Sequence, residues 1–238
     1  MDKNIAFIPV RGGSKSIPLK NIKEIAGKPL VYWTIESAAN CKDIDKVYVS
    51  TDSEKIKEVV EQYNGANKEK VQVVERSSET ASDTATTESA MLEFAEKHNF
   101  ENIILIQATS PLLETETLQE GINKLNDFDS IISLVEQKRF YWKKNEDNSV
   151  GPTNYDYLNR PRRQEFDGNL VENGAFYITS RERLLNTKCR ISGKIGACIM
   201  PEETYFEIDE PSDWIIIENL LNNRRENYNE KKDKAVYY

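Results

Sequence analysis

The sequence has 238 residues, of which 38% are hydrophobic and 30% charged, and its net charge is −8. This balance is typical of a globular protein with enough apolar material for a core, and the length favours one large domain or one domain with an insertion. The acidic charge argues against general nucleic-acid binding. No apolar run approaches the ~18–20 residues of a membrane span, and no signal peptide is visible, so we expect a cytoplasmic protein without membrane attachment.

A single histidine and three widely spaced cysteines exclude several kinds of site. His98 stands in a polar stretch, where we expect a solvated helix end. Catalytic triads built on histidine and histidine-rich metal sites are therefore excluded. Cys41, Cys189 and Cys198 form neither a disulfide framework nor a zinc knuckle, and we interpret them as reduced, mostly buried thiols.

In chain order, short apolar runs alternate with helical patterns over the first 135 residues. Strands are expected at 5–10, 47–49, 71–74, 102–107 and 130–135. Helices are expected from Pro29, from a cap at Asp52 or Ser53 to Tyr63, from Thr86 or Thr87 to His98, and over 115–125. This alternation predicts βαβ units in a Rossmann-like, mostly parallel α/β sheet with helices on both faces.

Ligands of such sheets bind beyond the carboxyl ends of the strands. Polar segments that follow predicted strands should therefore share one rim of the sheet. These segments are residues 11–21, 50–52, 76–87 and 107–111.

The segment 140–168 interrupts this rhythm, because it is aromatic and basic and has no helical pattern. We interpret it as a β-arm used for dimerisation, inserted at about 136–170 in a single domain that spans 1–238. A homodimer or a dimer of dimers is the expected assembly. Further strands are expected at 172–179 and 196–200, and a helix from Pro211 to about 221. The polar tail 223–238 is expected to be frayed.

The first rim segment, 11–21, carries two adjacent glycines and three cations, Arg11, Lys15 and Lys20. Glycines let the backbone approach a ligand and expose its N–H groups, and this combination suits a triphosphate. The segment is not a Walker A loop, because Ser14 stands where that motif needs glycine before lysine. We count Ser14 and Lys15 among the substrate-binding residues. A solvated surface turn is the alternative.

This loop resembles the signature of the acylneuraminate cytidylyltransferases, also called CMP-sialic acid synthetases. The signature is an apolar strand followed by Ala/Val-Arg-x-x-Ser-Lys-x-x-Pro-x-Lys-Asn. It stands here as Val10-Arg11-Gly-Gly-Ser14-Lys15-Ser-Ile-Pro18-Leu-Lys20-Asn21. Further blocks match in order: Ser50-Thr51-Asp52, Arg76-Ser77-Ser78-Glu79, Ser82-Asp83-Thr84, Gln107-Ala-Thr-Ser-Pro111, Arg160-Pro-Arg-Arg-Gln164, Glu172-Asn-Gly-Ala-Phe-Tyr177 and Ile208-Asp209. The resemblance covers about residues 4–221, and the last blocks look most like the animal branch.

The resemblance implies a fold of the nucleotide-diphospho-sugar transferase type and a reaction. CTP and a nonulosonic (sialic-type) sugar acid give the CMP-sugar and pyrophosphate with Mg²⁺, after the anomeric hydroxyl attacks the α-phosphorus. Catalysis of this kind depends on positioning and charge neutralisation. The alternatives are activation of KDN, legionaminate or Kdo, and a non-catalytic nucleotide-sugar-binding regulator. The presence of Arg11, Lys20 and Asp209 disfavours the regulator.

The resemblance, together with side-chain chemistry, assigns the nucleotide to the rim segments 11–21 and 76–87. Arg11 and Lys20 would hold the phosphates and stabilise the leaving pyrophosphate. Asn21 has donors and acceptors that suit a cytosine edge. Arg76 would contact the nucleotide. Thr87 stands where the family often has a nucleotide-contacting serine, although a helix N-cap is an equal alternative.

The sugar acid is assigned to Gln107 and to the arm. Arg162, Arg163 and Gln164 would meet the sugar carboxylate or the α-phosphate, from a neighbouring subunit. Arg162 matches the arginine most often given a catalytic role, which it would share with Lys20 and Asp209. A solvated basic arm is the alternative.

A metal site is expected at Glu207 and Asp209, which would point to the same face of a strand. Two carboxylates can hold a Mg²⁺ that also binds phosphate oxygens. The family usually has Asp-x-Asp here, so Asp209 is the firmer ligand, and Glu207 acts directly or through water. A polar strand end is the alternative. No residue stands out as a general base.

Overall fold

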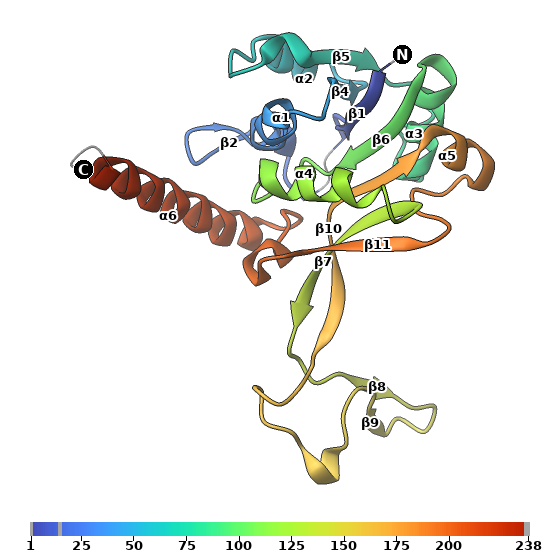
Figure 1. The fold of residues 1–238 in the computed structure, drawn as a ribbon, viewed down its shortest axis with the longest axis vertical. Helices are drawn as coiled ribbons and strands as arrows, with labels where there is room; N and C mark the ends of the chain where they lie inside the picture. Colours follow the sequence, from blue (N-terminus) through green and yellow to red (C-terminus); the bar gives the residue numbers. More distant parts are fainter. Residues whose placement is uncertain (1, 14–15, 236–238) are drawn as a thin grey trace.

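The computed structural model describes residues 2–13 and 16–235, and in it seven strands form one sheet (Figure 1). The strand order is β11-β7-β10-β6-β1-β4-β5. Neighbouring strands are parallel except at β10, which is antiparallel to both β6 and β7. The predicted mostly parallel sheet is therefore confirmed. The strand bounds are β1 Asp2–Pro9, β4 Lys46–Thr51, β5 Val71–Glu75, β6 Phe100–Ile106, β7 Ser130–Gln137, β10 Asn169–Ser180 and β11 Ile195–Met200.

Helices cover both faces of the sheet. On one face lie α1 (Leu30–Asn40), α2 (Glu54–Glu61) and α4 (Thr115–Lys124), and on the other lie α3 (Thr87–Lys97) and α5 (Arg181–Thr187). Strand β1 shows why its sequence is continuously apolar. Ala6 and Ile8 pack in the first core, whereas Ile5 and Phe7 pack in the second, because successive strand residues point to opposite faces. No helix in the described part of the chain combines the length and apolar composition that a membrane span needs.

A third apolar cluster supports the first rim segment. A small hairpin of β2 (Glu24–Ile25) and β3 (Lys28–Pro29) follows a 3₁₀ turn, η1 (Lys20–Ile22). Ile17 and Ile25 pack there with Leu30 and with residues of the last helix, such as Trp214. The sequence did not predict this hairpin, because strands of two residues are too short to show an alternating pattern. This cluster packs the first rim segment, 11–21, and the hairpin against helix α6 (Pro211–Ala235).

The sequence predicted that Asp52 or Ser53 caps α2 through its side chain, and this prediction is wrong. Ser53 occupies the N-cap position, but neither it nor Asp52 caps the helix through its side chain. Asp52 Oδ1 instead accepts a hydrogen bond from the backbone N–H of Gly12 at 2.9 Å. The carboxylate therefore fixes the first rim loop. The cap of α3 is Thr86, whose Oγ1 accepts from Ser89 N at 3.1 Å.

The last helix, α6 (Pro211–Ala235), is longer than expected and extends away from the sheet (Figure 1). Its backbone is helical beyond the expected end at about residue 221, as far as Ala235, and fraying of the tail remains a prediction. Two arginines explain the continuation. Arg224 donates to the carbonyl of Leu112 at 2.8 Å, and Arg225 donates to the carbonyl of Ala26. No proline or glycine follows Pro211 in the helix to end it.

The arm lies between β7 and β10, which leave the sheet together as a twisted pair (Figure 1). It contains β8 (Trp142–Lys144), β9 (Val150–Pro152) and the 3₁₀ turn η3 (Tyr157–Asn159). Its aromatic residues pack on one another, with the ring of Phe140 4.3 Å from that of Tyr155 and 4.9 Å from that of Phe166. Dimerisation through the arm remains a prediction.

The cysteines and the histidine lie close to their expected environments. Cys41 and Cys198 are buried and Cys189 is half-buried, and all three are free thiols. His98 follows the last residue of α3, but it is not fully solvated. Its ring stacks on that of Phe94, with centroids 4.2 Å apart, and burial lowers its pKa.

Candidate nucleotide-binding site

A cavity of about 470 Å³ opens at the carboxyl edge of the sheet, beyond the ends of β1, β5 and β6. Three of the four predicted rim segments line it, and the fourth contributes indirectly through Asp52. Seven residues that the sequence assigned to the site lie in its wall: Arg11, Lys20, Asn21, Arg76, Thr87, Gln107 and Asp209. Residues from the two ends of the chain therefore meet at one rim.

Arg11 leaves β1 where the strand ends. The preceding residue, Val10, still pairs with β4 by donating to the carbonyl of Ser50 at 2.8 Å. Gly12 follows, and an added Cβ there would lie 3.0 Å from that of Ser53, so a larger residue would have to push the Ser53 side chain aside. The Arg11 guanidinium donates to Asp83 Oδ1 at 2.7 Å. The predicted residues Ser14 and Lys15 lie outside the described residues.

Lys20 joins the first loop to the loop before α6. Its Nζ donates to the carbonyl of Ile208 and, at 3.2 Å, to Asp209 Oδ1. The loop before α6 is itself held at the rim, because Ile208 N donates to the carbonyl of Thr109 at 2.9 Å. Asn21, next to Lys20 in η1, is only 7% exposed. It also lines the cavity.

Arg76 adds a third cation at the end of β5. Its backbone N–H donates to the carbonyl of Thr51 at 3.0 Å, which continues the β4–β5 pairing. Burial lowers the pKa of the guanidinium, and nearby Arg11 lowers it further, against the opposing charge of Asp52. Its Nε is buried without a hydrogen-bond partner among the described residues. A bound anion would offset this cost of burying positive charge.

Thr87 and Gln107 close the wall on the side of β6. Thr87 is the first residue of α3, and its neighbour Thr86 is the N-cap, so the capping alternative for Thr87 is wrong. Gln107 follows β6, and its backbone N–H donates to the carbonyl of Ala175 at 3.1 Å. Both residues line the cavity.

Glu207 and Asp209 lie in a loop after the 3₁₀ turn η4 (Glu202–Tyr205), so their expected placement on a strand is wrong. The Glu207 carboxylate lies beside Gly174 and hydrogen-bonds Thr109. Burial and the neighbouring charge of Asp209 raise its pKa, against the effects of Lys20 and Thr109. It does not line the cavity, whereas Asp209 does.

In the part of the chain that the structure describes, no three His, Cys, Asp or Glu side chains are grouped to hold a metal ion. The two carboxylates are near enough for the charge of Asp209 to raise the pKa of Glu207. Their oxygen donors suit Mg²⁺, which usually takes one or two carboxylates and completes its shell with phosphate oxygens and water.

The arm residues do not reach the cavity within one chain. Arg162, Arg163 and Gln164 are all exposed, and Arg163 pairs with Glu202 at 3.7 Å. The physical reason is the direction of the arm, which carries them away from the sheet (Figure 1). Their contact with a substrate from a neighbouring subunit remains a prediction.

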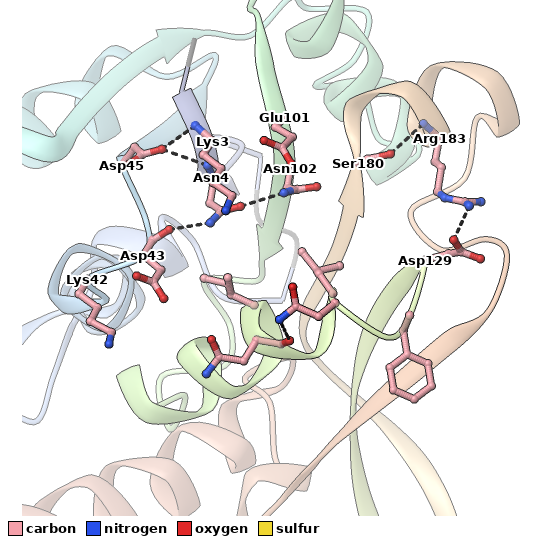
Figure 2. Close-up of a pocket in the computed structure, with 15 residues that line it drawn as sticks. Lys3, Asn4, Lys42, Asp43, Asp45, Glu101, Asn102, Asp129, Ser180 and Arg183 are labelled. Atoms are coloured by element: carbon pink, nitrogen blue, oxygen red, sulfur yellow. Dashed lines mark hydrogen bonds and ion pairs between the residues drawn. The ribbon is translucent and has the colours of Figure 1, made fainter.

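A second cavity, of about 510 Å³, lies at the opposite edge of the sheet (Figure 2). Its polar side chains bind one another. Asn102 Nδ2 donates to Asn4 Oδ1 at 2.9 Å, and Asn4 Nδ2 donates to the carbonyl of Asp43 at 2.9 Å. Arg183 is paired with Asp129. We assign a structural role to these contacts, which connect β1 with β6 and with the loop after α1.

The family model described as Cytidylyltransferase matches residues 5–232 of this chain. The chain belongs to this family. An N-acylneuraminate cytidylyltransferase of Oncorhynchus mykiss is 39% identical over 225 residues, which are 91% of this chain and 50% of the relative. A pseudaminic acid cytidylyltransferase of Campylobacter jejuni is 31% identical and covers 89% of this chain and 93% of its own. The chain spans about half the length of the fish relatives it matches.

Solved structures show the same fold for this cytidylyltransferase-family chain. A CMP:2-keto-3-deoxy-manno-octonic acid synthetase complexed with CTP has a TM-score of 0.66 at 17% identity and covers 93% of this chain and 99% of its own. A 4-diphosphocytidyl-2C-methyl-D-erythritol synthase from Anaerococcus prevotii has a TM-score of 0.66 at 16% identity and covers 92% and 96%. These neighbours confirm the predicted nucleotidyltransferase-type architecture.

Sequence reasoning missed Asp83, which lines the cavity and pairs with Arg11. The block Ser82-Asp83-Thr84 matched the family signature but received no role. Its place in a predicted rim segment, at the same edge of the sheet as a segment that carries three cations, was the available signal. The structure indicates that this carboxylate orients Arg11.

The raised pKa of Glu207 predicts a stabilising substitution. The raised pKa means that Glu207 binds a proton more tightly in the folded than in the unfolded protein. At a pH above its ordinary pKa, the charged carboxylate therefore lowers the free energy of unfolding. Glu207→Gln removes that cost and should raise the Tm at pH 7 by about 1–4 °C, since 1 kcal/mol corresponds to about 2–4 °C at this chain length. Thermal unfolding at pH 4 should show the difference reduced or absent. The exposed Glu202→Gln is the control, and a lower Tm for Glu207→Gln at pH 7 would contradict the assignment.

Proposed function

We propose that this chain transfers CMP from CTP to the anomeric hydroxyl of an N-acylneuraminate or a related nonulosonate and releases pyrophosphate. The observation that carries the proposal is the convergence of Arg11, Lys20 and Arg76 on one cavity beside Asn21, in a member of the cytidylyltransferase family. The names of its relatives support cytidine nucleotides and sialic-type sugars as substrates.

The nucleotide would lie across the ends of β1 and β5. Arg11 and Lys20 are the cations that would hold the β- and γ-phosphates, and each is held by a carboxylate until then. The transition state gains negative charge on the leaving pyrophosphate, so cations already fixed in place lower the barrier without reorganising. Asn21 would recognise the cytosine edge through its amide.

Asp209 would hold a Mg²⁺, with Glu207 in support directly or through water. When bound, the ion would neutralise phosphate charge and favour ionisation of the attacking hydroxyl. Lys20 contacts Asp209 at 3.2 Å, so the phosphate that Lys20 would hold and the ion that Asp209 would hold lie side by side. Glu207 is half-buried behind Asp209, and its interaction with Thr109 would orient it.

The sugar acid would lie beyond β6, next to Gln107, and the arm of a second copy would complete its site. Support comes from the composition of the arm. Trp142, Tyr157 and Leu158 are 50%, 60% and 80% exposed, which is unusual for large apolar side chains on one projection. A second copy that covers them would bring Arg162, Arg163 and Gln164 near a cavity. We therefore propose a homodimer, or a dimer of dimers, as the active form.

We also propose that the protein is cytoplasmic. The three cysteines are free, which fits a reducing compartment where disulfides do not persist.

Pseudaminate is a second candidate sugar, because the Campylobacter jejuni relative of that name matches nearly its whole length. A turnover panel distinguishes the candidates by pyrophosphate release. CTP and UTP are each combined with Neu5Ac, KDN, legionaminate, pseudaminate and Kdo in the presence of Mg²⁺. We expect release with CTP and at least one nonulosonate, and far less with UTP. No release with any nonulosonate would contradict the proposal.

Lys20→Ala should lower kcat/KM by about 100-fold or more, which is the range for loss of one preorganised charge-stabilising group. Steady-state kinetics with saturating sugar measure the loss. Lys68→Ala, a change at an exposed residue remote from the cavity, is the matched control and should leave kcat/KM unchanged. Wild-type rates for Lys20→Ala would refute the role given to this residue.

A further inference from the structure

Glu93, in the second turn of α3, holds the loop that follows β5. Its Oε2 accepts hydrogen bonds from Ser77 N at 3.3 Å, Ser77 Oγ at 3.0 Å and Thr80 Oγ1 at 2.6 Å. Its Oε1 accepts from Lys97 Nζ at 2.7 Å. The Glu93 side chain is only 16% exposed. One carboxylate therefore joins α3 to both ends of the turn 77–80.

The same turn holds the guanidinium of Arg76. Arg76 Nη2 donates to the carbonyl of Thr80, and this is the hydrogen bond that its side chain makes to the described residues. Thr80 is 9% exposed, and its hydroxyl also lies 3.2 Å from that of Ser77. Glu93, Thr80 and Arg76 thus form a continuous line of contacts that ends in the wall of the cavity.

We propose that Glu93 is a positioning residue for nucleotide binding, which acts through Thr80 to hold Arg76 in the orientation that contacts the nucleotide. This inference rests on the proposed function of the cavity. Glu93 itself lies outside the cavity wall, and no feature of the sequence had assigned it a role.

The chemistry of the contacts requires a carboxylate. All its partners donate, so an acceptor without protons is the group that satisfies them. Burial opposes the charge, but hydrogen bonds from Lys97, Thr80 and Ser77 outweigh it and lower the pKa of Glu93 to about 2. The group is therefore ionised throughout the neutral range. In Glu93→Gln these donors face either an NH₂ group, which cannot accept, or a neutral oxygen, which is a weaker acceptor. The hydrogen bonds that hold the turn 77–80 to α3 are then lost or weakened.

The test measures CTP affinity and kinetics in Glu93→Gln. We expect the Kd and the KM for CTP to rise about tenfold, equivalent to about 1.4 kcal/mol, with kcat and the KM for the sugar within about twofold of wild type. Lys97→Gln is the matched control, because it removes the partner of the other carboxylate oxygen, an exposed lysine, and leaves the loop contacts intact. Its CTP affinity should stay within about twofold of wild type.

A double-mutant cycle separates positioning from general destabilisation. In an Arg76→Met background, Glu93→Gln should weaken CTP binding by less than twofold further, because it acts through Arg76. Thr80→Val removes the hydroxyl contacts to Glu93 and Ser77 and leaves the Thr80 carbonyl that accepts from Arg76. It should weaken binding by about threefold, and it keeps the test available if Glu93→Gln does not fold.

Unchanged CTP affinity in folded Glu93→Gln or in Thr80→Val overturns the inference. So does a tenfold loss that persists in the Arg76→Met background. A wild-type protein that does not bind CTP overturns the proposed function itself, and the inference falls with it.

Discussion

Strand β1 pairs in parallel with β4 on one side and with β6 on the other, and the site depends on this constraint. Parallel pairing places the carboxyl ends of all three strands on one edge, so the loops that follow them share one rim. The core of the sheet supports this arrangement, because β1 is buried on both faces by helices. A loop that begins at Arg11 therefore lies beside loops that begin more than 40 and 95 residues later.

The rim gathers three cations in a chain of net charge −8. Like charges in a partly buried site are costly, and the structure offsets two of them with carboxylates, at Asp83 and at Asp209. The third, Arg76, is held by a backbone carbonyl. Such contacts keep the side chains in place for a polyanion, which makes stronger bonds to arginine than an exposed single carboxylate does. The free energy needed to hold the three cations close together is therefore supplied when the protein folds.

Much of this arrangement was predictable from the sequence, because it follows from strand order and loop composition. The apolar runs of β1, β5 and β6 indicated buried strands. Because the carboxyl ends of parallel strands share one edge, this placed Arg11, Arg76 and Gln107 together. Contacts that depend on side-chain geometry were not predictable. The use of Asp52 to hold Gly12 instead of capping α2 is one such case. The loop position of Glu207 is another case. Glu207 and Asp209 lie two residues apart, which fits one face of a strand equally well, so the spacing alone does not distinguish a strand from a loop.

The two extended parts of the molecule show a further limit of sequence reasoning. Helix α6 continues past residue 222 because Arg224 and Arg225 bind backbone carbonyls of distant loops, which no local pattern reveals. The arm was recognised as an interruption, but its direction is set by the twist of the β7–β10 pair (Figure 1). Arg162 on the arm is exposed and does not line the cavity at the carboxyl edge of the sheet.

The central claim is that the cavity beyond β1, β5 and β6 is the nucleotide site. A crystal structure of the protein with CTP and Mg²⁺ tests it most directly. The account predicts the triphosphate on Arg11 and Lys20, the cytosine at Asn21, and the metal ion on Asp209. A nucleotide bound instead in the cavity around Asn4 and Asn102, or on the arm, would contradict it.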